Sequence, residues 1–153
     1  MSVREPRVSV GAIRIDARAR RAMTAHARRD APRECCGLLI GRGAEVHFAA
    51  AVANHATSAS RYRLDDRAHI ALRRALRSFA PPLEIVGVYH SHPMGRAWPS
   101  ETDIAEAHYP EWCHVIVALG RRVRLAAFRI RRGRVEQLSV VGFRHGTRPG
   151  AGV

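Results

Sequence analysis

The chain has 153 residues, which suits one compact domain with a real hydrophobic core. It is 46% hydrophobic and 25% charged, as in an ordinary soluble protein, and no apolar run reaches the roughly 20 residues that a membrane span needs. The formal net charge is +13, and all 26 basic residues are arginine, which allows a nucleic acid or an acidic protein as partner. We expect a cytoplasmic protein, because the N-terminus has no apolar signal segment and three cysteines make a poor disulfide framework.

The first half of the chain predicts two helices and two strands. In chain order we expect a helix at 17–29, strands at 36–41 and 45–52, a polar loop at 54–63, and a helix from 65 or 66 to the Pro81-Pro82 pair. Asp16 can cap the first helix, and Pro32 stops it. The second helix should bury one apolar face, made of Ile70, Leu72, Leu76 and Phe79.

The second half predicts mostly strands. In chain order we expect a strand at 83–89, a short helix at 100–107, and a closing antiparallel meander of strands at 112–119, 123–130 and 135–141. The elements together predict an α/β fold in which one mixed, curved sheet is flanked by helices. We expect a single domain at 7–143 with flexible termini at 1–6 and 144–153.

The most informative segment begins where the strand at 83–89 runs into His90-Ser91-His92-Pro93. Side chains alternate along an extended backbone, so His90 and His92 should point to the same side. Asp103 lies in the first turn of the next helix, where the chain can double back toward both imidazoles. Two histidines and a carboxylate leave one coordination position for water, which is the pattern of catalytic zinc. Zinc in such a site lowers the pKa of its water to about 7.

A hydrolase built on these ligands also needs a proton shuttle and a donor for the oxyanion. Glu34 precedes a buried strand and is the best candidate for the general base, since apolar neighbours would raise its pKa. Ser100 lies three residues before Asp103 and is the candidate donor. Structural alternatives stay open, because Ser100 and Asp103 can form a capping box and Glu34 can be a solvated loop acid.

The remaining metal-binding residue types have simpler interpretations. Three cysteines are expected to be buried small hydrophobes: Cys35, Cys36 and Cys113. Five histidines lack matching partners in the sequence and are expected to be ordinary: His47, His55, His69, His108 and His114.

The joint pattern resembles the JAMM (MPN-plus) metalloprotease family. His-x-His, seven residues, Ser, two residues and Asp match its motif, and Glu34-Cys-Cys-Gly-Leu-Leu matches its upstream glutamate before a Leu-Leu pair. The resemblance covers about residues 10–140 and implies the cytidine-deaminase-like α-β-α fold of JAMM/MPN domains. It implies that His90, His92 and Asp103 hold one Zn²⁺, that Glu34 is the base, and that Ser100 helps to bind the oxyanion.

The resemblance also implies a substrate. JAMM enzymes hydrolyse the amide after the C-terminal Gly-Gly of ubiquitin-like proteins, and small bacterial members resemble hydrolases that release cysteine or another adduct from a sulfur-carrier protein. Only about fifty residues separate the strand after Glu34 from His90, which leaves no room for the long insertions of ubiquitin-chain-specific relatives. The sulfur-carrier substrate is therefore preferred over general ubiquitin-like deconjugation. No membrane partner is expected, and a homodimer remains open.

Two other function classes fit less of the sequence. Zinc deaminases of nucleobases use His/Cys/Cys ligands and a His-x-Glu motif, whereas this chain has His-x-His and no Pro-Cys-x-x-Cys. A non-catalytic arginine-rich module would bind nucleic acid with a steep salt dependence that metal removal does not change. The arginines are spread along the chain and do not form one aromatic-studded stripe, so nucleic acid is disfavoured.

Overall fold

The computed structural model describes residues 11–55 and 66–144. The elements in chain order are β1 (Ala12–Asp16), α1 (Ala17–Asp30), β2 (Cys36–Arg42), β3 (Glu45–Val52), α2 (Asp66–Leu76), β4 (Glu84–His92), α3 (Glu101–Ala105), β5 (Cys113–Leu119), β6 (Val123–Arg131) and β7 (Arg134–Phe143). The expected loop at 54–63 falls almost wholly outside the described residues, as do the expected flexible termini apart from Arg144.

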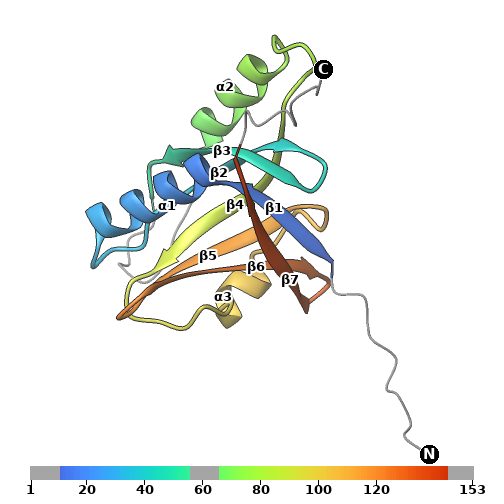
Figure 1. Cartoon of the computed structure of the whole chain (residues 1–153). Coiled ribbons are helices and arrows are strands. Elements are labelled where there is room, and N and C mark those ends of the chain that lie inside the picture. The colour runs from blue at the N-terminus through green and yellow to red at the C-terminus, as the bar shows by residue number, and fades with distance from the viewer. Residues whose placement is uncertain (1–10, 56–65, 145–153) are drawn as a thin grey trace, which may run out of the picture.

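The strands form one mixed sheet that closes on itself, in the order β1-β3-β2-β4-β5-β6-β7 (Figure 1). β5, β6 and β7 are the antiparallel meander that the sequence predicts. β1 is the one described strand that has no counterpart among the expected elements. It pairs in parallel with both β3 and β7, and so it turns the expected curved sheet into a closed one.

Helices α1 and α3 pack on opposite faces of β5. Met23 and Ala27 of α1 join a core cluster with Val115 and Val117, whereas Ile104 of α3 packs against the cluster that contains Ile116. Alternation along the strand therefore separates a large core under α1 from a smaller one under α3. The Asp16 side chain accepts a hydrogen bond from the amide of Arg18, which confirms it as the N-cap of α1.

Helix α2 differs from its prediction in length and in its buried face. It ends at Leu76, where the hydroxyl of Ser78 donates to the carbonyl of Ala75 in the turn that follows. Ile70 is 56% exposed and Phe79 is 52% exposed, so the expected four-residue apolar face is wrong. Only Leu72 and Leu76 are at least partly buried, and Leu72 packs beside Trp112.

β4 lies between β2 and β5 and places His90 and His92 in the middle of the sheet. β4 runs on through His92, beyond the expected end of the strand, so both histidines are strand residues. His90 pairs with Cys36 of antiparallel β2 and with Ile116 of parallel β5. The three cysteines are buried and unpaired, as expected. None of the described helices has the length and apolar character that crossing a membrane would take.

Candidate metal centre

Three side chains converge at the C-terminal end of β4. The Nε2 atoms of His90 and His92 lie 3.0 Å apart, and Oδ2 of Asp103 lies 3.1 Å from the first and 3.3 Å from the second. All three residues are at most 9% exposed. The two histidines thus share a side, as strand alternation predicts, and α3 supplies the carboxylate from the far side of the intervening loop.

The spacing of these three atoms fits one divalent ion. Zinc bonds to nitrogen and oxygen are about 2.0–2.1 Å, and the ligand atoms of a tetrahedral zinc site therefore lie about 3.3 Å apart. The separations of 3.0–3.3 Å agree with that geometry. Two imidazoles and one carboxylate are also a donor set that suits zinc and leaves a fourth position for water or substrate. The residues present therefore fit the metal that the sequence predicts.

Surrounding hydrogen bonds orient the ligand candidates. The Nδ1–H of His92 donates to the carbonyl of Arg96 at 2.7 Å, which leaves the Nε2 lone pair facing the other two ligands. Oδ2 of Asp103 accepts from the amide of Ser100 at 2.8 Å. Burial alone would raise the pKa of Asp103, but hydrogen bonds from His90 and His92 outweigh it and hold that pKa far below its ordinary value.

Ser100 and Asp103 form the capping box that is the structural alternative to a chemical role for these two residues. The Ser100 hydroxyl oxygen accepts from the amide of Asp103 at 3.1 Å, while the Asp103 carboxylate caps the amide of Ser100. A hydroxyl has one proton to donate and two lone pairs, so this bond leaves the proton of Ser100 available. Capping and donation to a substrate oxygen are therefore compatible, and the second role stays a prediction.

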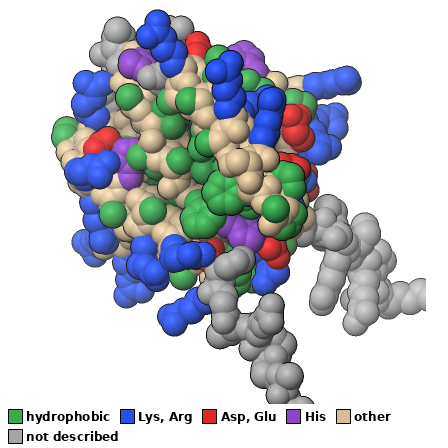
Figure 2. All heavy atoms as spheres, turned by 90° about the horizontal axis from the view of Figure 1, so that it is seen from above, with side chains coloured by type: hydrophobic (Ala, Val, Ile, Leu, Met, Phe, Trp, Pro, Cys, Tyr) green, Lys and Arg blue, Asp and Glu red, His purple; other side chains and the backbone are tan. Residues whose placement is uncertain are grey.

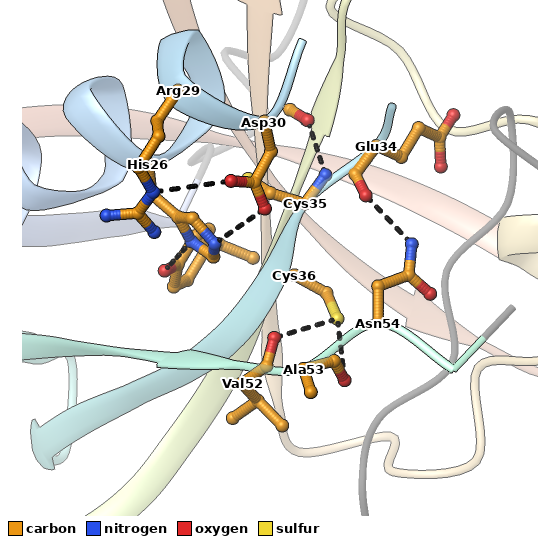
Figure 3. Close-up of polar contacts among 11 residues, drawn as sticks. His26, Arg29, Asp30, Glu34, Cys35, Cys36, Val52, Ala53 and Asn54 are labelled. Atoms are coloured by element: carbon orange, nitrogen blue, oxygen red, sulfur yellow. Dashed lines mark hydrogen bonds and ion pairs between the residues drawn. The ribbon is translucent and has the colours of Figure 1, made fainter. Parts of the chain in front are cut away.

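Glu34 lies just before β2 and is 8% exposed, which contradicts the alternative of a solvated loop acid. Its carbonyl accepts from Nδ2 of Asn54 at 2.8 Å, and its side chain points away from Cys36 (Figure 3). Burial raises the pKa of Glu34 to about 7; the charge of His92 lowers it and that of Asp103 raises it. The electrostatic effects of His92 and Asp103 indicate that the Glu34 carboxylate lies near both residues. A pKa of about 7 suits a group that accepts and returns a proton near neutral pH.

Two further residues border the site, and the sequence predicted a role for neither. Ser91 accepts from the amide of Cys35 through its hydroxyl at 2.8 Å and donates its own amide to the Cys35 carbonyl at 3.0 Å. These bonds join the residue after Glu34 to the residue between the two histidines. A serine in the buried part of a strand was the available signal, because a buried hydroxyl needs a partner.

His114 is the second, and its surroundings differ from those of an ordinary surface histidine. It is 5% exposed on β5, and neither ring nitrogen has a hydrogen-bond partner among the described residues. Burial lowers its pKa to about 4, with a further lowering by His90 and an opposing effect of Asp103. It therefore lies close behind the ligand cluster, which local sequence could not reveal.

Comparison with known proteins gives the family of this chain. The family described as prokaryotic homologs of the JAB domain matches residues 16–131. A CysO-cysteine peptidase from Mycobacterium tuberculosis is 38% identical over 122 residues, which cover 76% of this chain and 81% of that protein. A probable TtuB-protein conjugate cleaving protease from Thermus thermophilus is 39% identical over 87 residues, or 56% of each chain.

The fold points to the same relationship. The solution structure of a protein from Desulfitobacterium hafniense has a TM-score of 0.78 and 26% sequence identity, and the match covers 88% of this chain and 95% of that one. The matched family region runs from the cap of α1 to the end of β6 and so includes Glu34 and all three ligand candidates. The chain belongs to the prokaryotic JAB domain family.

Proposed function

We propose that this protein is a zinc metallopeptidase that cleaves the amide bond after the C-terminal Gly-Gly of a small sulfur-carrier protein and releases cysteine or a similar adduct. The observation that carries the proposal is the cluster of His90, His92 and Asp103 with buried Glu34 nearby. The substrate class rests on the similarity to a CysO-cysteine peptidase over most of both chains. We also propose a cytoplasmic location, since all three cysteines are free thiols.

The chemistry divides between the metal ligands and two other side chains. A metal held by His90, His92 and Asp103 supplies polarisation of the scissile carbonyl and makes water more acidic. Glu34, with a pKa of about 7, can accept a proton from the attacking water and then donate it to the departing amine. Ser100 can donate its hydroxyl proton to the oxygen that gains negative charge, since its own oxygen already accepts from Asp103.

General deconjugation of ubiquitin-like proteins is the second candidate. It is favoured by the similarity to a protease named for cleaving TtuB-protein conjugates, although that match covers 56% of each chain. The two candidates differ in the leaving group, which is a single amino acid in one case and a lysine side chain of another protein in the other.

The experiment that separates the candidates uses two substrates of one carrier protein. One carries a C-terminal Gly-Gly-Cys, and the other has its Gly-Gly joined to a lysine side chain. We expect intact mass spectrometry to show loss of one cysteine from the first at a higher kcat/KM, with cleavage abolished by a chelator and restored by zinc. Preference for the second substrate would favour deconjugation. No cleavage of either substrate by zinc-loaded protein would contradict the proposed function.

The face drawn in Figure 2 offers nucleic acid no continuous positive surface. Figure 2 shows arginine side chains spread around the periphery of one face, with hydrophobic and uncharged side chains between them. Phosphate tracking uses a continuous positive groove with stacking aromatics in series. The dispersed pattern on this face instead suits weak, long-range attraction of an acidic protein.

A further inference from the structure

A pocket of about 570 Å³ opens beside the metal centre, between the loop at 95–98 and the β5–β6 turn. No aspartate or glutamate is among the described residues that line it. Its lining includes four arginines, one tryptophan and one alanine of β5: Arg96, Arg121, Arg122, Arg124, Trp98 and Ala118. We call this feature the arginine pocket.

The arginine pocket begins directly at a metal-ligand candidate. The carbonyl of Arg96 accepts from Nδ1 of His92 at 2.7 Å, and Ala118 is the partner of His92 in the β4–β5 register. Gly95 packs so closely on the same ring that an added Cβ would lie 3.2 Å from Cβ of His92. A molecule that fills the pocket therefore lies against the loop and the strand that hold His92 in place.

The pocket combines one anchored aromatic ring with uncompensated positive charge. Trp98 packs edge-on against Phe128 at 5.1 Å between ring centroids and still exposes 46% of its surface. None of the four guanidinium groups forms an ion pair with a carboxylate in the part of the chain that the structure describes. Exposed arginine and tryptophan side chains of this kind are the residues that dominate binding energy at protein interfaces.

We infer that the arginine pocket docks an acidic segment of the carrier protein during cleavage. This inference rests on the proposed function and names the feature of the substrate that the pocket selects. Guanidinium groups pair with carboxylates through two parallel hydrogen bonds, and several arginines around one pocket match several carboxylates close together in a chain. The net charge of +13 draws an acidic partner toward the protein, and the pocket then fixes its position beside the scissile bond.

Nucleic acid is the competing occupant, and the pocket fits it less well. Single-stranded nucleic acid is held by successive aromatic platforms, whereas the described lining of the pocket has Trp98 as its one aromatic residue. The pocket also adjoins a site with the donor set of an amide hydrolase. Its occupant should therefore belong to the protein substrate.

The test compares charge reversal inside the pocket with the same reversal elsewhere. The pocket variant is Arg121→Glu/Arg122→Glu, on the exposed β5–β6 turn. The matched control is Arg20→Glu/Arg21→Glu, an exposed pair on α1 that changes the net charge equally. Cleavage of a carrier protein ending in Gly-Gly-Cys is measured for wild type and both variants across a range of salt concentrations.

We expect the pocket variant to raise KM about tenfold or more, because one lost contact of about 1.4 kcal/mol is a factor of ten. The effect on kcat should be much smaller, and the control should stay within about threefold of wild type in KM. The salt dependence of KM should also weaken in the pocket variant. Equal KM values in the two variants, or a loss confined to kcat, would overturn the inference.

The same variants separate this inference from its alternatives. A single-stranded RNA oligonucleotide that binds wild type and loses affinity in the pocket variant, while the KM for the carrier protein is unchanged, would assign the pocket to nucleic acid and overturn the proposal. If wild type cleaves the carrier conjugate but the pocket variant matches the control, only the pocket inference fails. If zinc-loaded wild type cleaves no conjugate, the proposed function fails first and the inference with it.

Discussion

Glu34 is the residue whose ionisation should set the pH dependence of cleavage. Burial raises its pKa to about 7, against the lowering effect of His92 and with the added effect of Asp103. A general base must be deprotonated, so kcat/KM should rise about tenfold per pH unit below about pH 7 and level off above it. A pH–rate profile with the carrier conjugate measures this. A rate that stays flat from about pH 5 to about pH 7 would remove Glu34 from the role of base.

His114 should make the folded state sensitive to acid. Its pKa is lowered to about 4 by burial, whereas a histidine in an unfolded chain titrates near 6.5. The unfolded chain then binds more protons between these values, so stability is lost as the pH falls from about 6.5 to about 4, by roughly 3 kcal/mol.

The variant His114→Phe isolates this effect, because every other histidine is common to both proteins. Denaturant unfolding of the metal-free protein should show a shallower fall in the free energy of unfolding for the variant over that pH window. Identical slopes for the variant and wild type would show that His114 is not the buried neutral group described here.

At the level of elements, the contact between β4 and the segment that precedes β2 holds Glu34 beside the three ligand candidates. Ser91→Ala would leave the buried amide of Cys35 without its acceptor, which costs about 1–3 kcal/mol. Ser139→Ala on β7 is the control, since that serine is exposed and should change the free energy of unfolding by less than about 0.5 kcal/mol. Urea unfolding compares the two variants. A loss in Ser91→Ala no larger than in the control would show that the contact does not hold these elements together.

The elements with strong local signals were predictable from the sequence. Strand alternation places His90 and His92 on one side, and the capping box at Ser100 fixes the start of α3 beside Asp103. The burial of Glu34 was harder to predict. It depends on the register that pairs Cys36 with His90, and nothing local to either segment encodes that register.

The features that the sequence did not predict depend, like the burial of Glu34, on contacts between distant parts of the chain. β1 has only five residues and gains its stability from two partners far along the chain, β3 and β7, so its closing role leaves no local signal. Ile70 and Phe79 follow a helical apolar pattern, yet the sheet offers them no surface to cover. His114 has no local feature that separates it from a surface histidine. Tertiary packing decides each of these cases.

At the scale of the whole molecule, the closed sheet supports a single site with two sides. Glu34 approaches from the segment before β2, and the arginine pocket opens toward the β5–β6 turn, with the ligands of β4 and α3 between them. The proposed base and the proposed docking surface thus lie on separate elements around one cluster of ligand candidates. Changes to the pocket should therefore alter substrate binding without altering metal content.

Metal content and cleavage, measured on the same samples of wild type, Glu34→Gln and His92→Ala, test the central claim most directly. We expect about one zinc per chain in wild type and in Glu34→Gln, with cleavage of the Gly-Gly-Cys conjugate in wild type and at least about a hundredfold loss in Glu34→Gln. His92→Ala should lose both zinc and cleavage, because it removes one of three protein ligands. Cleavage by Glu34→Gln at the wild-type rate, or a full zinc load in His92→Ala, would contradict the account.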